Sequence, residues 1–170
     1  MSTPAAECFI DPRVAAAWQA VGAVQDPELP ALTLVDLGIV RSVELGPDRE
    51  LRVRLSPTYT GCPATEYIRV LVERALDEAG LGPVSVTHVL APAWSSDWIT
   101  ADGRRKLAEY GIVPPSPAVT SSKRLEECPI ACPRCGSLRT ESVSEFGSTP
   151  CKALHRCLDC REPFERFKCI

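Results

Sequence analysis

Two C-x-x-C pairs, Cys132–Cys135 and Cys157–Cys160, constrain this chain more than any other feature, and 21 residues separate them. Each C-x-x-C turn presents two sulfurs to one point, so the two turns together supply the four soft ligands of a tetrahedral Zn²⁺ site. The stretch 128–170 is too short to fold on a hydrophobic core alone, and metal binding would supply the missing folding free energy. The sequence therefore predicts a β-rich, four-cysteine zinc ribbon over 128–170.

The other cysteines leave several alternatives open. A rubredoxin-like iron site uses the same four-thiolate geometry as structural zinc but would be redox-active. Cys128, Cys151 and Cys169 fit two interpretations. They are either partly buried small apolar side chains or ligands of a second soft-metal site beside the ribbon, with Cys62 or His155 as a further ligand. Cys8 lies near the terminus, and no role is assigned to it.

Composition narrows the class of protein. The longest apolar runs fall well short of the ~18 residues that span a bilayer, and the start MSTPAAECFIDPR has neither a cationic nor an apolar signal region. Nine cysteines in a chain of this kind favour metal or redox chemistry in the cytoplasm over disulfides. The formal net charge is −3, and residues 128–170 carry 7 Lys/Arg against 5 Asp/Glu. That distribution argues against a nucleic-acid footprint.

The order of elements predicts an α+β fold, with a small α-β-β-α-β-α domain over 1–113, a linker over 114–127 and the ribbon over 128–170. Apolar periodicity, turn residues and caps define each element. The stretch PPSPAVTSSKRLEE has no periodicity, which is typical of a linker. The expected elements are helices over 12–25, 63–79 and 100–110 and strands over 39–45, 51–55, 84–90 and, in the ribbon, 140–146.

A third candidate site lies at the start of the second helix, where Cys62 precedes Pro63. There, unpaired backbone amides and the positive end of the helix dipole would favour the thiolate. Such a thiol suits a nucleophile, a metal ligand or a transient cluster ligand, and the alternative is a simple helix cap. Asp26 and Glu28 would form either an acidic pocket wall or an ordinary proline-bracketed turn.

Catalytic constellations are absent from the sequence. It contains no Gly-rich phosphate loop, no Ser-His-Asp arrangement and no H-E-x-x-H motif, and its histidines are His88 and His155 alone. General-base chemistry therefore has few candidates, and we do not expect an autonomous enzyme.

Several stretches resemble known families. DPELPALTLVDLGIVRSVEL and PTYTGCPA are similar to the SufT-like iron–sulfur assembly domain, with its D-P-E, D-L-G and T-G-C-P signatures. APAWSSDWIT, CPRCGS, SEFGSTPCKALHRC and the terminal FKCI resemble the PaaD family (also written PaaJ) of phenylacetyl-CoA epoxidase accessory subunits. The resemblance runs from Asp11 to Ile170.

The resemblance implies a role and a set of residues. Its family accompanies a multisubunit di-iron ring oxygenase that epoxidises phenylacetyl-CoA in aerobic phenylacetate breakdown. PaaD proteins are thought to assist assembly of the di-iron site or of the reductase iron–sulfur cluster, without being the catalyst. Cys62 corresponds to the reactive cysteine of the assembly domain. Four residues match motif positions with expected supporting roles: Asp26, Glu28, Asp36 and Gly38.

Three hypotheses follow. In the first, the chain is a maturation factor whose Cys62 holds Fe or an Fe-S cluster transiently, while the zinc ribbon docks the oxygenase or reductase component. In the second, it is a stoichiometric structural subunit of the oxygenase complex. In the third, it is an electron-transfer module with iron in the four-cysteine site. No membrane or nucleic-acid partner is expected.

Overall fold

The computed structural model of the chain describes residues 11–59, 61–116 and 130–170. Cys8, Cys128 and most of the expected linker lie outside this part of the chain. The α+β class and the α-β-β-α-β-α order followed by a β-rich region are confirmed. The elements are α1 (Pro12–Gly22), β1 (Val40–Leu45), β2 (Leu51–Leu55), α2 (Thr65–Glu78), β3 (Val84–His88), the 3-10 turn η1 (Ser96–Trp98), α3 (Ala101–Glu109), β4 (Ile112–Val113), β5 (Thr140–Ser144), β6 (Lys152–Cys157) and β7 (Pro163–Phe167).

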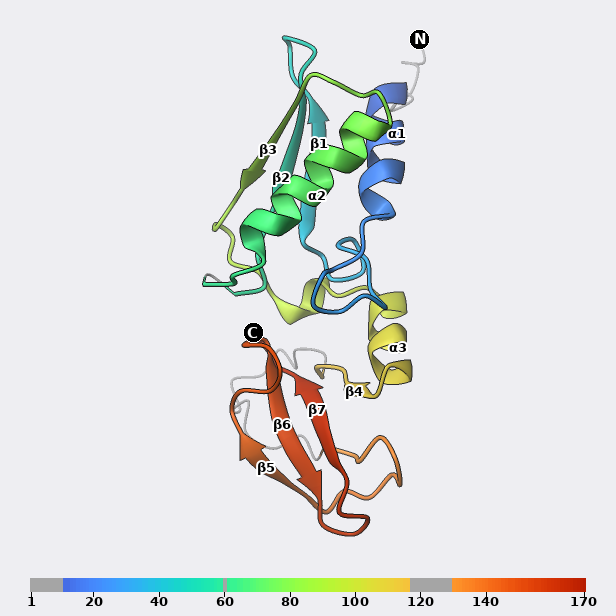
Figure 1. Cartoon of the computed structure of the whole chain (residues 1–170), viewed down its shortest axis with the longest axis vertical. Coiled ribbons are helices and arrows are strands. Elements are labelled where there is room, and N and C mark those ends of the chain that lie inside the picture. The colour runs from blue at the N-terminus through green and yellow to red at the C-terminus, as the bar shows by residue number, and fades with distance from the viewer. Residues whose placement is uncertain (1–10, 60, 117–129) are drawn as a thin grey trace, which may run out of the picture.

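The N-terminal module is a three-stranded sheet in the order β1-β2-β3, with β2 antiparallel to β1 and parallel to β3. Leu51, Val53 and Leu55 of β2 are buried while Arg52 and Arg54 point to solvent, as the period-two pattern predicts. The helices α1 and α2 contact each other and pack against β1 and β3 respectively (Figure 1). One face of the sheet is therefore covered and carries the core.

Local sequence explains where the helices begin and which face they bury. The carboxylate of Asp11 accepts a 2.8 Å hydrogen bond from the Arg13 amide, and Pro12 occupies the first turn of α1. In α2, the buried side chains Ile68, Val72 and Leu76 recur at helical spacing. The helices therefore follow the caps and apolar stripes that the sequence contains.

The loop between α1 and β1 is tied to α3 by Asp36. Its carboxylate accepts hydrogen bonds from the Thr33 amide at 2.9 Å and from Lys106 Nζ at 2.8 Å, and its carbonyl accepts one from the Thr100 amide. Gly38 follows with φ 67°, and a Cβ there would lie 2.6 Å from Cβ and from the carbonyl oxygen of Trp98. This close approach requires glycine at position 38.

The C-terminal module is a four-stranded sheet in the order β4-β7-β6-β5. Strands β5, β6 and β7 form an antiparallel meander, with His155 of β6 opposite Ser142 and Phe164. The two residues of β4 come from the N-terminal side of the chain and pair in parallel with β7. The N-terminal module therefore contributes an edge strand to the ribbon sheet.

The two modules share one hydrophobic core. Cys151 and Phe167 of the ribbon are buried together with the core residues of the N-terminal module. The Phe167 ring lies 6.0 Å from the Trp94 ring, centroid to centroid, and the Trp94 indole donates a hydrogen bond to the Leu37 carbonyl. Figure 1 shows the modules end to end, with the C-terminus at their junction.

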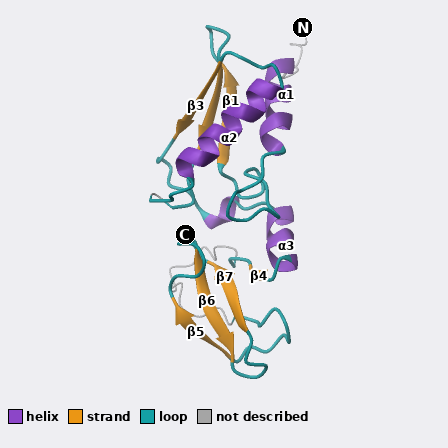
Figure 2. Cartoon of the chain, in the orientation of Figure 1, coloured by secondary structure: helices purple, strands orange, loops and turns teal. Residues whose placement is uncertain are grey.

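In the part of the chain that the structure describes, helices occur in the N-terminal module and, as α3, beside the junction (Figure 2). Within the described residues, no helix has both the length and the apolar character needed to cross a membrane.

Candidate metal centre and junction thiols

The four cysteines of the C-x-x-C pairs converge on one point at the end of the ribbon. Their sulfurs all lie within 4.8 Å of one another. Cys132 Sγ and Cys160 Sγ are 3.7 Å apart, and Cys135 Sγ and Cys157 Sγ are 3.6 Å apart. A tetrahedron with Zn–S bonds of about 2.3 Å has sulfur separations of about 3.8 Å. The sequence prediction that these four residues share one site agrees with this geometry, and the group can hold a metal ion.

The turn around Cys132 explains why the sulfurs point together. The Gly136 amide donates a 2.9 Å hydrogen bond to the Cys132 carbonyl, and Gly136 has φ 74°, a conformation that glycine adopts at little cost. Cys132 and Cys157 are buried and form a small cluster with Phe164. The metal-binding turns are therefore anchored by their own packing.

Electrostatics within the group favour a bound cation. Backbone hydrogen bonds from Cys160 and Asp159 lower the pKa of Cys157 to about 7. At Cys160, the Glu162 amide lowers the pKa. Burial and the sulfurs of the other three cysteines raise it by more, so that the pKa of Cys160 rises to about 12. The negative charge of one thiolate thus raises the pKa of the neighbouring thiol, and a divalent cation among the sulfurs would offset that repulsion.

The remaining described cysteines do not gather in one place. Cys169 lies near Arg166, whose guanidinium is 3.6 Å from its sulfur. Cys151 is buried at the junction, and the Thr149 hydroxyl lies 3.1 Å from its sulfur. His155 stacks on Phe164, 5.7 Å away, within the ribbon.

Cys151 instead lines the same hollow as Cys62. Both thiols border a small hollow at the junction, which we call the junction hollow, lined by Glu28, Thr58, Tyr59, Cys62, Pro150 and Cys151. Pro150 and Cys151 come from the turn before β6, and the other four residues come from two loops of the N-terminal module. The ribbon therefore forms one wall of the Cys62 site.

The loop before α2 holds Cys62 by its backbone. The Cys62 amide donates to the Tyr59 carbonyl at 3.0 Å, and the Cys62 carbonyl accepts a 2.7 Å hydrogen bond from the Thr65 hydroxyl. The helix itself begins at Thr65, and Cys62 is half-buried just before it. Cys62 is thus held by its backbone just before the first turn of α2, and it does not serve as the N-cap of that helix.

The expectation of a low thiol pKa at Cys62 was wrong. Burial raises the pKa of this thiol, and the Ala64 amide, which lowers it, does not compensate. The negative charges of Glu28 and Asp26 raise the pKa further. Because those charges are brought in by a distant loop, the sequence position at a helix start could not reveal them.

The acidic loop beside Cys62 is itself ordered. Asp26 is buried, and its carboxylate accepts hydrogen bonds from the amides of Glu28 at 2.9 Å and Leu29 at 2.8 Å. Burial raises the pKa of Asp26, and burial together with the Asp26 charge raises that of Glu28. The positive charge of Lys152, from the ribbon, acts in the opposite direction and lowers the pKa of both carboxyl groups. Lys152 also forms a 2.9 Å ion pair with Glu165. Both interpretations of the acidic pair hold in part, since Asp26 caps the turn while Glu28 lines the hollow.

The sequence analysis allowed Cys62 as a further ligand of a site with Cys128, Cys151 and Cys169, and the structure brings Cys151, but not Cys169, to the hollow that Cys62 lines. The sequence did not indicate Lys152 as a counter-charge to the acidic loop. Cys151 and Lys152 both lie more than 85 positions from Cys62 in the chain. The sequence signal for Cys151 was its position outside the C-x-x-C spacing, and Lys152 had no signal.

Two family models match separate parts of the chain. Residues 15–89 match the family model of the iron–sulfur cluster assembly protein, and residues 116–168 match that of the PaaD zinc beta ribbon domain. A solved Bacillus anthracis structure of a domain of unknown function, DUF59, has 25% identity and a TM-score of 0.52, covering 56% of this chain and 91% of its own.

Among curated proteins, the chain is 46% identical over 160 residues to one of the subunits of the "Putative 1,2-phenylacetyl-CoA epoxidase" of Escherichia coli K12, covering 94% of each chain. It is 28% identical over 85 residues to the Fe-S protein maturation auxiliary factor of Porphyromonas gingivalis W83, covering 49% of this chain and 80% of that one. With two matched modules and near-complete coverage of the epoxidase relative, the chain belongs to the PaaD family of phenylacetyl-CoA epoxidase subunits.

Proposed function

We propose that this chain is a non-catalytic accessory subunit of a phenylacetyl-CoA epoxidase system and that it assists assembly of an iron centre in that system. The observation that carries the proposal is the position of Cys62. It is a half-buried thiol beside Glu28, in a loop of the module that matches the iron–sulfur assembly family. Its clients would be the oxygenase or the reductase subunits.

In this role the two sulfur sites have different tasks. Zinc in the four-cysteine group would hold the ribbon together, because those sulfurs are already gathered and partly buried. Iron, as cargo, would be held by Cys62 at the junction. Free thiols in such number are best maintained in a reducing compartment, so we place the protein in the cytoplasm.

Replacement of Cys62 by Ser in cells that co-express the epoxidase subunits tests this role. We expect iron content and epoxidase activity of the purified complex to fall severalfold, with the amount of complex unchanged. Cys169→Ser is the matched control, since Cys169 is another partly buried thiol outside the junction hollow. Unchanged iron and activity with Cys62→Ser would remove Cys62 from the mechanism.

A stoichiometric structural subunit is the second candidate, and exposed apolar side chains favour it. Tyr59, Tyr67 and Val70 are 49%, 57% and 45% exposed on the N-terminal module near the start of α2. A structural subunit predicts recovery with the oxygenase at a fixed ratio and full activity with Cys62→Ser. Tyr67→Ser would then release the subunit while iron content per oxygenase stays the same.

The electron-transfer alternative depends on the metal in the ribbon. A four-thiolate iron site absorbs visible light and bleaches on reduction, whereas zinc is colourless. Metal analysis with an anaerobic absorption spectrum separates the two, and we expect one zinc per chain and no visible band.

A further inference from the structure

Cys62 shares the junction hollow with a second cysteine, Cys151, which comes from the other module. Cys151 precedes β6, which runs from the junction to the far end of the ribbon, where Cys157 ends it (Figure 1). Six residues of strand span about 20 Å, so Cys151 is remote from the four-cysteine group. It lines the junction hollow instead, together with Cys62.

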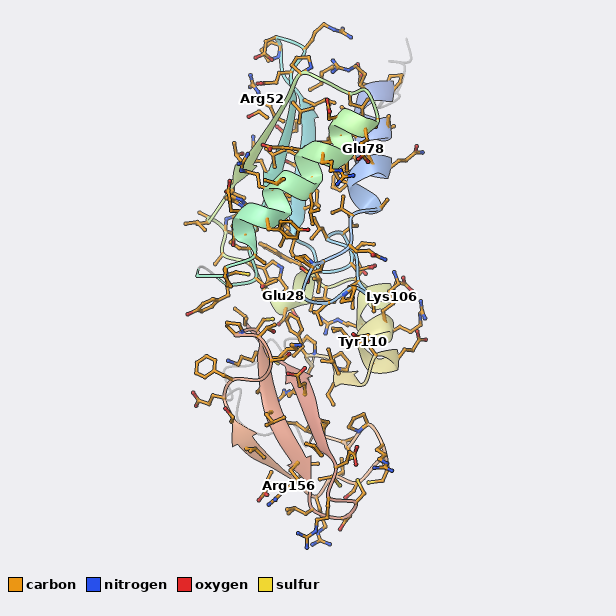
Figure 3. The ribbon with its side chains drawn as sticks, in the orientation of Figure 1. Glu28, Arg52, Glu78, Lys106, Tyr110 and Arg156 are labelled. Carbon is orange, nitrogen blue, oxygen red and sulfur yellow. The ribbon has the colours of Figure 1, made fainter. Side chains whose placement is uncertain are left out.

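Glu28 completes a set of three donors around this hollow. It lines the hollow with both thiols, and its negative charge acts on both sulfurs. Its backbone amide is held by the buried Asp26 carboxylate, while its side chain is only partly buried. Figure 3 shows Glu28 at the level where the N-terminal module meets the ribbon.

We propose that Cys62, Cys151 and Glu28 together bind one divalent transition-metal ion across the module junction. The inference rests on the proposed function, for which this ion would be Fe²⁺. On binding, the two thiols lose their protons to solvent and the carboxylate binds as the anion, so M²⁺ and three donors give a complex with net charge −1. Two thiolates favour a borderline cation such as Fe²⁺ or Co²⁺ over Mg²⁺ or Ca²⁺, which prefer oxygen ligands.

The geometry indicates a labile site. Among the described residues, the ribbon cysteines are the one group of three or more Cys, His, Asp or Glu ligand atoms that all lie within 4.8 Å of one another. The three junction donors must therefore close around the ion by side-chain rotation. The hollow is small, which favours a single ion over a cluster. A preformed site retains its metal and a partly open one releases it, as cargo requires.

Because each module contributes a thiol ligand, metal occupancy and module docking are coupled. Cys151 and Phe167 are buried in the shared core, so the ribbon holds Cys151 in place as a rigid wall. A client that shifted the ribbon against the N-terminal module would separate the ligands and release the ion. The ribbon thus supplies a ligand as well as a docking surface.

Cobalt binding to the full-length protein, with its ribbon metal in place, tests the site directly. We expect one additional Co²⁺ per chain with a thiolate-to-cobalt charge-transfer band in the near ultraviolet, removable by a chelator that leaves the ribbon metal bound. Cys62→Ser and Cys151→Ser should each weaken binding by at least about 100-fold, since a ligand is lost. Glu28→Gln should weaken it about tenfold, and Cys169→Ser should bind as the parent does.

Wild-type affinity in Cys151→Ser would overturn the proposal, as would wild-type affinity in Glu28→Gln. The Glu28→Gln variant decides the matter if Cys151→Ser does not fold, because residue 28 is outside the core.

Iron loading of the epoxidase is measured separately from cobalt binding. If Cys62→Ser lowers loading and Cys151→Ser does not, the two-thiol site fails while the maturation role stands. If cobalt binding requires both thiols but neither affects loading, the site stands and the maturation role fails.

Discussion

Ser96 and Ile170 are joined by hydrogen bonds in both directions, although they lie 74 residues apart. The Ser96 amide donates to the Ile170 carbonyl at 3.0 Å, and the Ile170 amide donates to the Ser96 hydroxyl at 3.3 Å. The Arg104 guanidinium also donates to the Ser96 carbonyl at 2.7 Å. The last residue of the ribbon is thereby fixed to the N-terminal module, next to the ring contact between Trp94 and Phe167. This docking defines the junction, where Cys62 and Cys151 line the same hollow.

Replacement of Phe167 by Ala should destabilise the whole protein. The side chain is fully buried in the shared core, and truncation of such a ring costs about 3–5 kcal/mol. Urea unfolding followed by tryptophan fluorescence measures the loss. Phe146→Ala is the control, since that ring is 60% exposed, and it should cost less than about 1 kcal/mol. Equal losses in the two variants would contradict a shared core.

Gly38→Ala should be more harmful than Gly80→Ala, although the two glycines have nearly the same φ, 67° and 68°. Both substitutions carry a backbone cost of about 1–2 kcal/mol. At Gly38 the added Cβ also collides with Trp98, whereas nothing lies within 4 Å at Gly80. Overpacking adds about 1–3 kcal/mol. Thermal unfolding of the two variants measures the difference. Equal melting temperatures would contradict the close approach of Gly38 to Trp98.

Acid should weaken the attachment of α3 to the loop that contains Asp36. Burial alone would raise the pKa of Asp36, but hydrogen bonds from Lys106 and Thr33 lower it more, so its folded pKa lies below the usual 3.8. A lowered folded pKa contributes stability above the unfolded pKa, and this stability is lost as the pH falls through the folded pKa.

Asp36→Asn should therefore lose about 1–3 kcal/mol near neutral pH and show a smaller decrease in stability below pH 4 than the parent. The unfolding free energy from pH 6 to pH 3 measures both effects. Asp48→Asn removes a carboxylate whose pKa is also lowered, by a backbone hydrogen bond from Glu50 and by Arg52, but because this group is exposed and screened by solvent it should change the curve less than Asp36→Asn does. Parallel pH curves for Asp36→Asn and the parent would contradict the assignment.

Removal of metal from the ribbon should unfold that module. Chelation at low pH, or Cys157→Ser, removes the cation that gathers the four sulfurs, and the end of the sheet beside those sulfurs has little other core than Phe164. Circular dichroism and amide exchange should report loss of β5 and β6, with β2 and α2 protected. Cys169→Ser should retain one zinc and the full sheet. An unchanged ribbon in the metal-free protein would show that the sulfurs are not structural ligands.

The sequence predicted the structural features that depend on local patterns of residues. Caps, apolar stripes and period-two alternation located the helices and strands of the N-terminal module, and the C-x-x-C spacing located the four-cysteine group. Strand β4 was not predicted, because two residues have no periodicity and their partner β7 lies some 50 residues further along the chain. The raised pKa of Cys62 was missed for a related reason. It depends on burial and on Glu28, which tertiary contacts bring to the loop.

Iron transfer in vitro tests the central claim most directly. The chain is loaded with one Fe²⁺ anaerobically and mixed with metal-free oxygenase in the presence of a chelator that captures free iron. We predict that wild-type protein and Cys169→Ser deliver iron to the oxygenase, measured by its metal content and epoxidase activity, and that Cys62→Ser does not. Equal delivery by Cys62→Ser and the wild-type protein would contradict the account.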